Sequence, residues 1–155
     1  MVKRILVTGA TGFVGQHTQN YLLEKGFDIY LIARDQKSRK WASSVNLIQA
    51  DFLDPQTWTE DVREIRPSHL LHLAWYTKHG AFWSSTENFK WLAASLQLAK
   101  VFAESGGKRF VGAGTCAEYE WSDTALSEQE SPLKPNTLYG QAKHSLNKLL
   151  ERYFE

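Results

Sequence analysis

Tyr139 and Lys143, in the stretch LYGQAK, have residue types and a spacing that suit proton transfer. Residues four apart lie on one face of a helix, so the ammonium of Lys143 would stand near the phenol of Tyr139. A nearby positive charge favours the ionised phenol, which can then exchange a proton with an alcohol or a ketone. The alternative interpretation is an exposed helical tyrosine and lysine without a chemical role.

Three glycines spaced three apart, Gly9, Gly12 and Gly15, form a second candidate site in the stretch VTGATGFVG. They lie between an apolar run and a helix-like segment. Small residues at a junction of strand and helix let the backbone approach a pyrophosphate, and the helix N-terminus supplies free N–H groups. A tight turn with close helix packing is the alternative. The flanking strand and helix favour the dinucleotide site.

The elements that must position these residues alternate along the chain. Strands are expected at residues 4–8, 28–33, 46–49, 69–74 and 109–113. Helices are expected at 13–25, from Asp54 to before Pro67, from a capping box at Ser84 and Glu87 to Gly106, and from Tyr139 onward. Alternation of this kind predicts right-handed crossovers and an α/β, Rossmann-like doubly wound parallel sheet in the order 3-2-1-4-5.

The composition limits the class of protein. With 155 residues the chain is expected to form one domain, residues 1–155. A formal charge of +1 with 23% charged residues gives no basic nucleic-acid surface. Cys116 is the only cysteine, which excludes an intramolecular disulfide, and no apolar run approaches a membrane span. We therefore predict a cytoplasmic protein with a small-molecule partner, without nucleic-acid or membrane binding and without a metal site.

Five stretches, TGATGFVG, ADFLD, HLLHLAW, GAGTCAEY and LYGQAK, occur in an order and spacing that resemble a known family. The chain resembles the N-terminal half of an extended short-chain dehydrogenase/reductase of the NAD(P)-dependent nucleotide-sugar epimerase, dehydratase and 4-ketoreductase group. The resemblance implies that Tyr139 is the catalytic acid/base, that Lys143 holds the nicotinamide ribose, and that Thr115 bonds the reacting oxygen. The cofactor-binding residues that it implies are Gly9, Thr11, Gly12, Phe13, Val14, Gly15, Arg34, Asp51, Phe52, Leu73, Ala74, Tyr139 and Lys143.

The identity of the cofactor depends on the end of the second strand. An NAD site places a carboxylate there for the ribose hydroxyls, whereas a 2′-phosphate calls for arginine. This chain has Ala33 followed by Arg34, with Lys37 and Arg39 close by. We therefore predict NADP(H) in preference to NAD(H). Asp35 takes the NAD role instead if the strand ends later.

The residues after Thr115 bear on the reaction. Dehydratases of the family carry an adjacent acidic pair there, whereas this chain has Cys116 and Ala117. Epimerisation through a transient ketone, or 4-keto reduction, is therefore favoured over dehydration. We interpret Cys116 as a small buried residue at a strand end, with contact to the substrate as the alternative. Glu118 stands where an apolar residue is usual, and the sequence offers no reason for it.

The segment after the fourth strand is rich in aromatic side chains, at the sheet edge where open α/β sheets bind ligands. Two interpretations stay open, stacking on a base or sugar and packing against another part of the protein. His72 is expected to face the core, and Asn88 matches a family position near the active site. The aromatic and basic residues of this segment are Trp75, Tyr76, Lys78, His79, Phe82 and Trp83.

Family members continue beyond the helix that holds Tyr139 and Lys143. The chain is therefore expected to be an N-terminal half that lacks the C-terminal strands and the substrate domain. Its last helix, with Leu146, Leu149 and Leu150, would pack on the sheet or on a partner helix of a homodimer. The alternative function is a non-catalytic NADP(H)-binding module or sensor, since a fold alone does not decide activity.

Overall fold

The computed structural model describes residues 3–34 and 44–154. The chain groups into two compact units. The first contains Met1–Ala74 and Gln97–Ala113, and the second contains Trp75–Leu96 and Gly114–Glu155.

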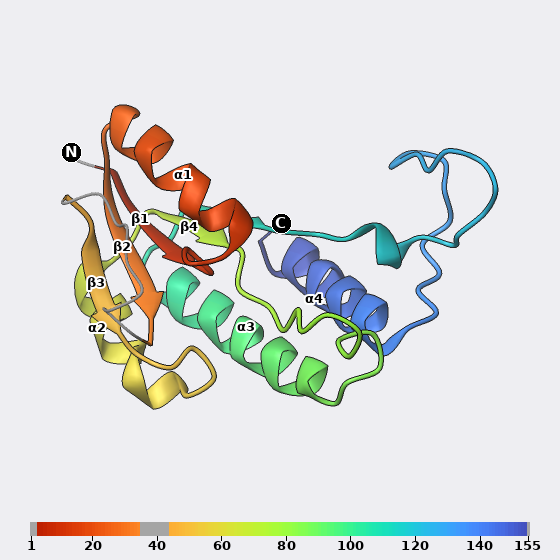
Figure 1. Cartoon of the computed structure of the whole chain (residues 1–155). Helices are drawn as coiled ribbons and strands as arrows, with labels where there is room; N and C mark the ends of the chain where they lie inside the picture. The colour runs from red at the N-terminus through yellow and green to blue at the C-terminus, as the bar shows by residue number, and fades with distance from the viewer. Residues whose placement is uncertain (1–2, 35–43, 155) are drawn as a thin grey trace. The chain divides into compact units, whose positions relative to one another are not determined.

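A five-stranded sheet forms the centre of the first unit (Figure 1). Its strands are β1 (Lys3–Thr8), β2 (Phe27–Ala33), β3 (Asn46–Gln49), β4 (His69–His72) and β5 (Arg109–Gly112). All four strand pairs are parallel and the order is β3-β2-β1-β4-β5, which confirms the predicted fold class. Ile5 of β1 aligns with Ile29 of β2 on one side and with His69 of β4 on the other. The carboxyl ends of all strands therefore share one edge.

Four α-helices accompany the strands in the described residues. They are α1 (Phe13–Glu24), α2 (Thr59–Ile65), α3 (Glu87–Glu104) and α4 (Leu138–Phe154), with short 3₁₀ turns η1 (Pro55–Thr57) and η2 (Cys116–Glu118). Helix α1 lies on one face of the sheet, while α2 and the C-terminal half of α3 lie on the other (Figure 1). Helix α4 belongs to the second unit, as does the N-terminal half of α3.

Apolar side chains from the strands and helices fill the core of the first unit. The second half of β1 is buried on both faces, as expected for a central parallel strand. Trp58 is fully buried, stacks on Phe52, and donates its indole N–H to the Phe52 carbonyl at 3.1 Å. His72 lies in the core, as predicted, with its Nδ1 2.6 Å from the Thr8 hydroxyl.

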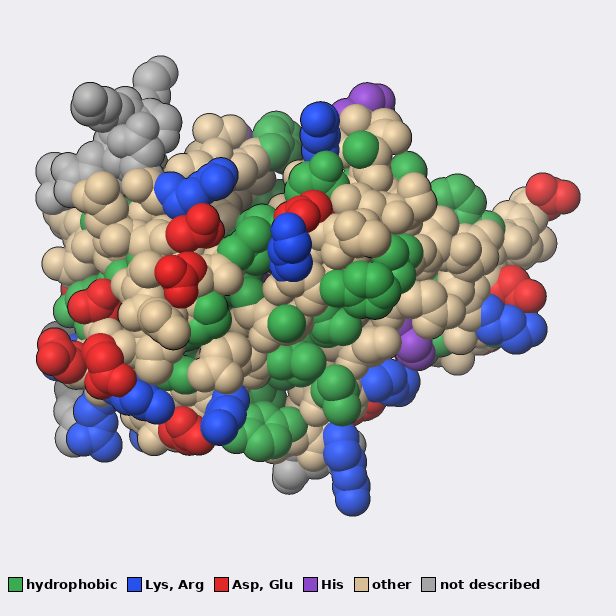
Figure 2. Space-filling model, turned by 90° about the horizontal axis from the view of Figure 1, so that it is seen from below, with side chains coloured by type: hydrophobic (Ala, Val, Ile, Leu, Met, Phe, Trp, Pro, Cys, Tyr) green, Lys and Arg blue, Asp and Glu red, His purple; other side chains and the backbone are tan. Residues whose placement is uncertain are grey.

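Helix α3 carries hydrophobic residues on an exposed side as well as on its buried side. Phe89, in its first turn, is exposed. Hydrophobic side chains lie among charged ones on the face of the molecule seen in Figure 2.

Within the described ranges no helix has both the length and the apolar character needed to cross a membrane.

Several predicted boundaries differ from the structure by a few residues. Asp54 caps the 3₁₀ turn η1, accepting from the Gln56 N–H at 3.2 Å, and α2 begins only at Thr59. Ser85 rather than Ser84 bonds the first turn of α3, since its hydroxyl accepts from the Glu87 N–H at 3.2 Å. Such small shifts follow from local hydrogen bonds that residue types alone do not specify.

Candidate functional site

The glycine loop follows β1 in the first unit, and two of its glycines are required by the fold itself. Gly9 has φ +71°, and a Cβ there would lie 2.6 Å from the Ala74 backbone nitrogen. A Cβ on Gly15 would meet the Gly9 carbonyl oxygen and would lie 2.6 Å from the Cα of Ala10. Backbone atoms cannot yield to such contacts, so both positions need glycine without reference to a ligand.

Gly12 differs from the other two glycines because the space beside it is open. A Cβ at this position would have one close neighbour, the Gly9 carbonyl oxygen at 3.2 Å. Gly12 is also the N-cap of α1 and provides no side-chain cap for the helix N–H groups. The flanking Thr11, Phe13 and Val14 are exposed. An open cradle at a helix N-terminus fits a pyrophosphate, which needs close backbone approach and free N–H donors.

Gln19 of α1 forms a hydrogen bond to the glycine loop, a contact that the sequence motifs did not predict. Its side chain is buried and its Nε2 donates to the Ala10 carbonyl at 3.3 Å. The spacing of Gln19 from the loop, one helical turn beyond Gly15, is the signal that would have indicated it.

The other predicted cofactor residues of the first unit lie at the same carboxyl edge of the sheet. The Leu73 N–H donates to the Thr8 carbonyl at 3.1 Å, and the Ala74 N–H donates to the Thr8 hydroxyl at 3.3 Å. Asp51 is exposed just beyond β3, where its Oδ1 accepts from the Leu53 N–H at 3.0 Å. Phe52 lies in the core instead, where its carbonyl accepts from the Trp58 indole, so its side chain is not exposed to a ligand.

The second unit contains the predicted catalytic residues. Thr115 precedes η2, and its hydroxyl accepts from the Ala117 N–H at 3.2 Å. Glu118 completes a reciprocal capping box, because its Oε1 accepts from the Thr115 N–H at 3.0 Å. The backbone at Thr115 is therefore held from both ends of the turn.

Helix α4 packs closely on this turn at Gly140, the residue after Tyr139. A Cβ on Gly140 would meet the Ala117 carbonyl oxygen and would lie 3.0 Å from the Pro135 side chain. The Tyr139 N–H donates to the Trp83 carbonyl at 3.1 Å. The Tyr139 ring meets Phe82 edge-on at 4.9 Å between centroids. Glycine in the Tyr-Gly motif thus lets the turn after Thr115 and the helix of Tyr139 come together.

Lys143 is buried one turn further along α4. Its Nζ lies 4.4 Å from the centre of the Trp75 ring, a cation–π contact. Trp75 is fixed in turn, because its indole N–H donates to Asn88 Oδ1 at 2.9 Å. Burial lowers the pKa of Lys143 from 10.5 to about 8, and the charge of Glu118 opposes this shift. The aromatic segment therefore includes a residue that contacts the predicted catalytic lysine.

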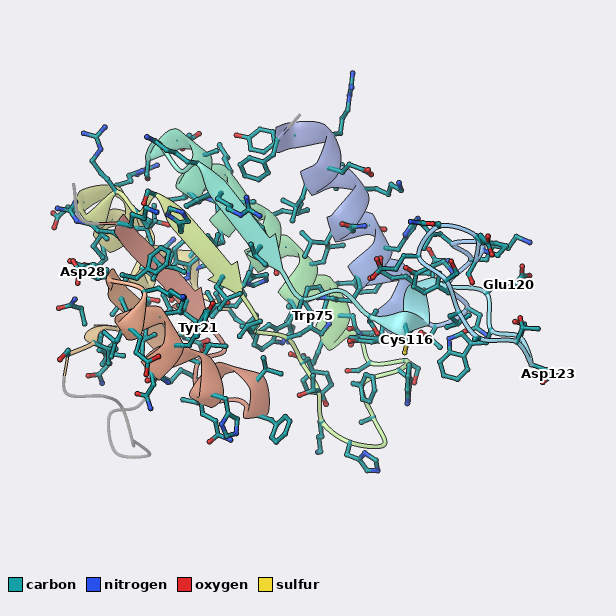
Figure 3. All side chains as sticks on the ribbon, turned by 90° about the horizontal axis from the view of Figure 1, so that it is seen from above. Tyr21, Asp28, Trp75, Cys116, Glu120 and Asp123 are labelled. Carbon is teal, nitrogen blue, oxygen red and sulfur yellow. The ribbon has the colours of Figure 1, made fainter. Side chains whose placement is uncertain are left out.

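Cys116 departs from its predicted environment. The sequence suggested a buried residue at a strand end, but the thiol is exposed on η2 (Figure 3). The reason is the turn itself, since the capping box directs Ala117 and Glu118 inward and leaves the first residue of η2 outside. Trp121 follows the turn and donates its indole N–H to the Cys116 carbonyl at 3.2 Å.

The structure thus groups the predicted residues into two sets. Thr115, Tyr139 and Lys143 share the second unit with Asn88, which the resemblance places near the active site, and with Glu118, which the motifs did not explain. The first unit contains the glycine loop and the ends of β2, β3 and β4.

Comparison with known proteins gives a consistent result. The model of a family described as the NAD dependent epimerase/dehydratase family matches residues 5–155. UDP-glucose 4-epimerase 2 of Arabidopsis thaliana is 25% identical over 92% of this chain, and UDP-glucose 4-epimerase of Bacillus subtilis is 26% identical over 94%. These matches cover 45% and 46% of the relatives, so the chain spans about half the length of the curated proteins that it resembles.

Solved structures match the fold over almost the entire chain. The Bordetella bronchiseptica enzyme WbmG in complex with NAD has a TM-score of 0.81 at 23% identity, covering 98% of this chain and 50% of that one. The Thermus thermophilus UDP-glucose 4-epimerase complex with NAD has a TM-score of 0.79 at 24% identity, covering 97% and 50%.

The prediction of NADP(H) is wrong. The matched family is NAD dependent, and both structures named above are NAD complexes. Arg34 lies directly after β2 with an exposed side chain, and one exposed guanidinium at a strand end does not make a 2′-phosphate site. Asp35, Lys37 and Arg39, which entered the same prediction, lie outside the described residues.

Proposed function

We propose, from the premise that this chain belongs to the NAD dependent epimerase/dehydratase family, that it is the NAD-binding half of a nucleotide-sugar epimerase or 4-ketoreductase. The UDP-glucose 4-epimerases among its relatives support the substrate class. In this proposal residues 1–155 form one NAD-binding domain, and the sugar-binding part lies outside them. A homodimer and a cytoplasmic location stay predictions.

The cofactor would occupy the edge of the sheet in the first unit. Gly12 leaves open the approach to the N-terminus of α1, where free N–H groups favour the pyrophosphate. Asp51, exposed beyond β3, would accept hydrogen bonds from the adenine side of the cofactor. Leu73 and Ala74 would line the path toward the nicotinamide.

The chemistry would belong to the second unit. NAD, when bound, supplies the acceptor and donor of hydride. Tyr139 would take the proton from the substrate hydroxyl as the ketone forms and return it afterwards, while Thr115 would hydrogen-bond the reacting oxygen. Lys143, buried one turn along the same helix, would hold the nicotinamide ribose.

The close packing of η2 on α4 is the observation that best supports the enzyme proposal. The Ala117 carbonyl meets Gly140, so the backbone that follows Thr115 contacts the helix turn that bears Tyr139. A module that only binds nucleotide has no need for a threonine, a tyrosine and a buried lysine in one unit. The second candidate, a non-catalytic dinucleotide-binding module, shares the glycine loop and would need nothing from the second unit.

Calorimetric titration of the 155-residue chain with NAD tests the cofactor site. We expect saturable binding that Gly12→Val weakens at least about tenfold, because the added side chain fills the open cradle. Ala93→Val, which enlarges an exposed side chain on α3, is the control and should bind as the wild type does. A folded Gly12→Val chain with wild-type affinity would remove the glycine loop from the proposal.

A turnover assay with UDP-glucose then separates the two candidate functions. Formation of UDP-galactose in the presence of NAD, lost in Tyr139→Phe, would support the epimerase. Reduction of a UDP-4-keto sugar by NADH, also lost in Tyr139→Phe, would support the 4-ketoreductase. Because the sugar-binding part is proposed to lie outside residues 1–155, this assay is run on these residues together with that part. Binding of NAD by such a protein without either reaction would favour the binding module.

A further inference from the structure

Glu118 is a buried acidic residue in the second unit, and its side chain is only 7% exposed. Its Oε1 accepts from the Thr115 N–H at 3.0 Å. Its Oε2 lies 3.7 Å from Nδ1 of His144, and its charge acts on Lys143. The carboxylate therefore faces one backbone donor and the His144 side chain of α4, and Lys143 is the residue directly before His144 on that helix.

The capping role alone does not require a negative charge. A glutamine at the third position of a capping box accepts the same backbone hydrogen bond as a glutamate. Burying a charged carboxylate costs free energy unless basic groups or hydrogen bonds offset it. A charge at Glu118 is therefore offset by the ammonium of Lys143, on which it acts, and by the backbone N–H of Thr115.

The charge of Glu118 acts on the protonation of Lys143, whose pKa it raises. Its ammonium is buried against the face of Trp75, where loss of hydration disfavours the protonated form. An opposite charge within the same buried cluster is the main means of keeping a buried amine protonated.

We propose that Glu118 is a positioning residue that keeps Lys143 in its ammonium form and holds the backbone of Thr115, so that one carboxylate prepares both partners of Tyr139. This inference rests on the proposed function for its meaning in catalysis. The electrostatic coupling between Glu118 and Lys143 is a property of the free chain. It can be measured without cofactor or substrate.

The test is an NMR titration of the chain labelled with ¹³C at the lysine Cε, with the Lys143 signal assigned by Lys143→Arg. In Glu118→Gln we expect the titration midpoint of Lys143 to fall by about one pH unit, because the amide keeps the hydrogen bond but not the charge. Glu120→Gln is the matched control, since Glu120 is exposed two residues away and pairs with Lys134. Its Lys143 midpoint should equal that of the wild type.

Glu118→Met provides a second neutral variant of similar length, in case the buried amide disturbs the fold. A midpoint that falls in either folded variant supports the proposal, and a midpoint that stays or rises in the folded variants overturns it. Failure of both variants to fold overturns it as well, because the carboxylate would then serve the fold alone. Absence of NAD binding in the wild type would reject the proposed function and leave this titration as informative as before.

Discussion

Replacing Lys143 by methionine tests whether the lysine is buried at an energetic cost. Methionine keeps the length and apolar stem of lysine and removes the ammonium that lies against Trp75. The folded chain then no longer has to bury this positive charge. We expect the variant to differ from the wild type mainly in how its stability depends on pH.

The sign and size of the expected change in stability with pH follow from the pKa of Lys143. In the unfolded chain the amine keeps its proton up to a pKa near 10.5, whereas in the folded chain burial lowers the pKa to about 8. Below pH 8 the amine is protonated in both states, so the folded state bears the full free-energy cost of burying the ammonium. Stability of the wild type therefore rises between pH 8 and pH 10.5, by about 3 kcal/mol for this one group.

Urea unfolding at a series of pH values measures this directly. The free energy of unfolding of the wild type minus that of Lys143→Met should increase by about 3 kcal/mol from neutral pH to pH 10.5. Taking the difference removes the titration of other groups. Lys148→Met is the control, because Lys148 is exposed and pairs with Glu151, and its difference should stay flat. A flat difference for Lys143 as well would refute the buried ammonium.

Three further predictions concern the loop, the second unit and assembly. Gly15→Ala should lower the stability of the free chain by several kcal/mol, because the added methyl group meets backbone atoms, whereas Gly12→Ala should cost under about 1 kcal/mol. Equal shifts of the thermal unfolding midpoint in the two variants would contradict this prediction. Asn88→Leu should cost about 2 kcal/mol in urea unfolding, because the part-buried indole N–H of Trp75 and the Phe82 carbonyl lose this partner, whereas the Ser85 carbonyl still accepts from the backbone N–H of residue 88; a cost within experimental error would exclude a structural role. If the exposed apolar residues of α4 form a homodimer, light scattering should show a dimer that Leu149→Asp converts to monomer; a monomeric wild type would reject that interface.

The sequence predicted the layout of the first unit well, because alternating apolar runs and helix caps report directly on a parallel α/β sheet. The order of the strands and the burial of His72 were confirmed. The turn after β5 was harder to predict. Cys116 looks apolar in sequence, yet the capping box at Thr115 and Glu118 turns its thiol outward.

Buried polar contacts account for most of what the sequence did not reveal. Nothing in the spacing of Trp75, Asn88 and Lys143 shows that an amide fixes an indole on which an ammonium lies. Gln19 and Glu118 likewise gain their roles from groups brought close by the fold. The choice of cofactor failed for a related reason, since a charged residue beside a strand end does not reveal by itself what it binds.

The three glycines of the loop would respond differently to a loss of function. If a descendant of this chain no longer bound nucleotide, selection for folding alone would still disfavour side chains at Gly9 and Gly15, where backbone atoms leave no room. Gly12 has only one close neighbour in the fold, so a drifting lineage would be free to replace it. In such a lineage, the residue at position 12 would distinguish a working nucleotide site from an inherited scaffold.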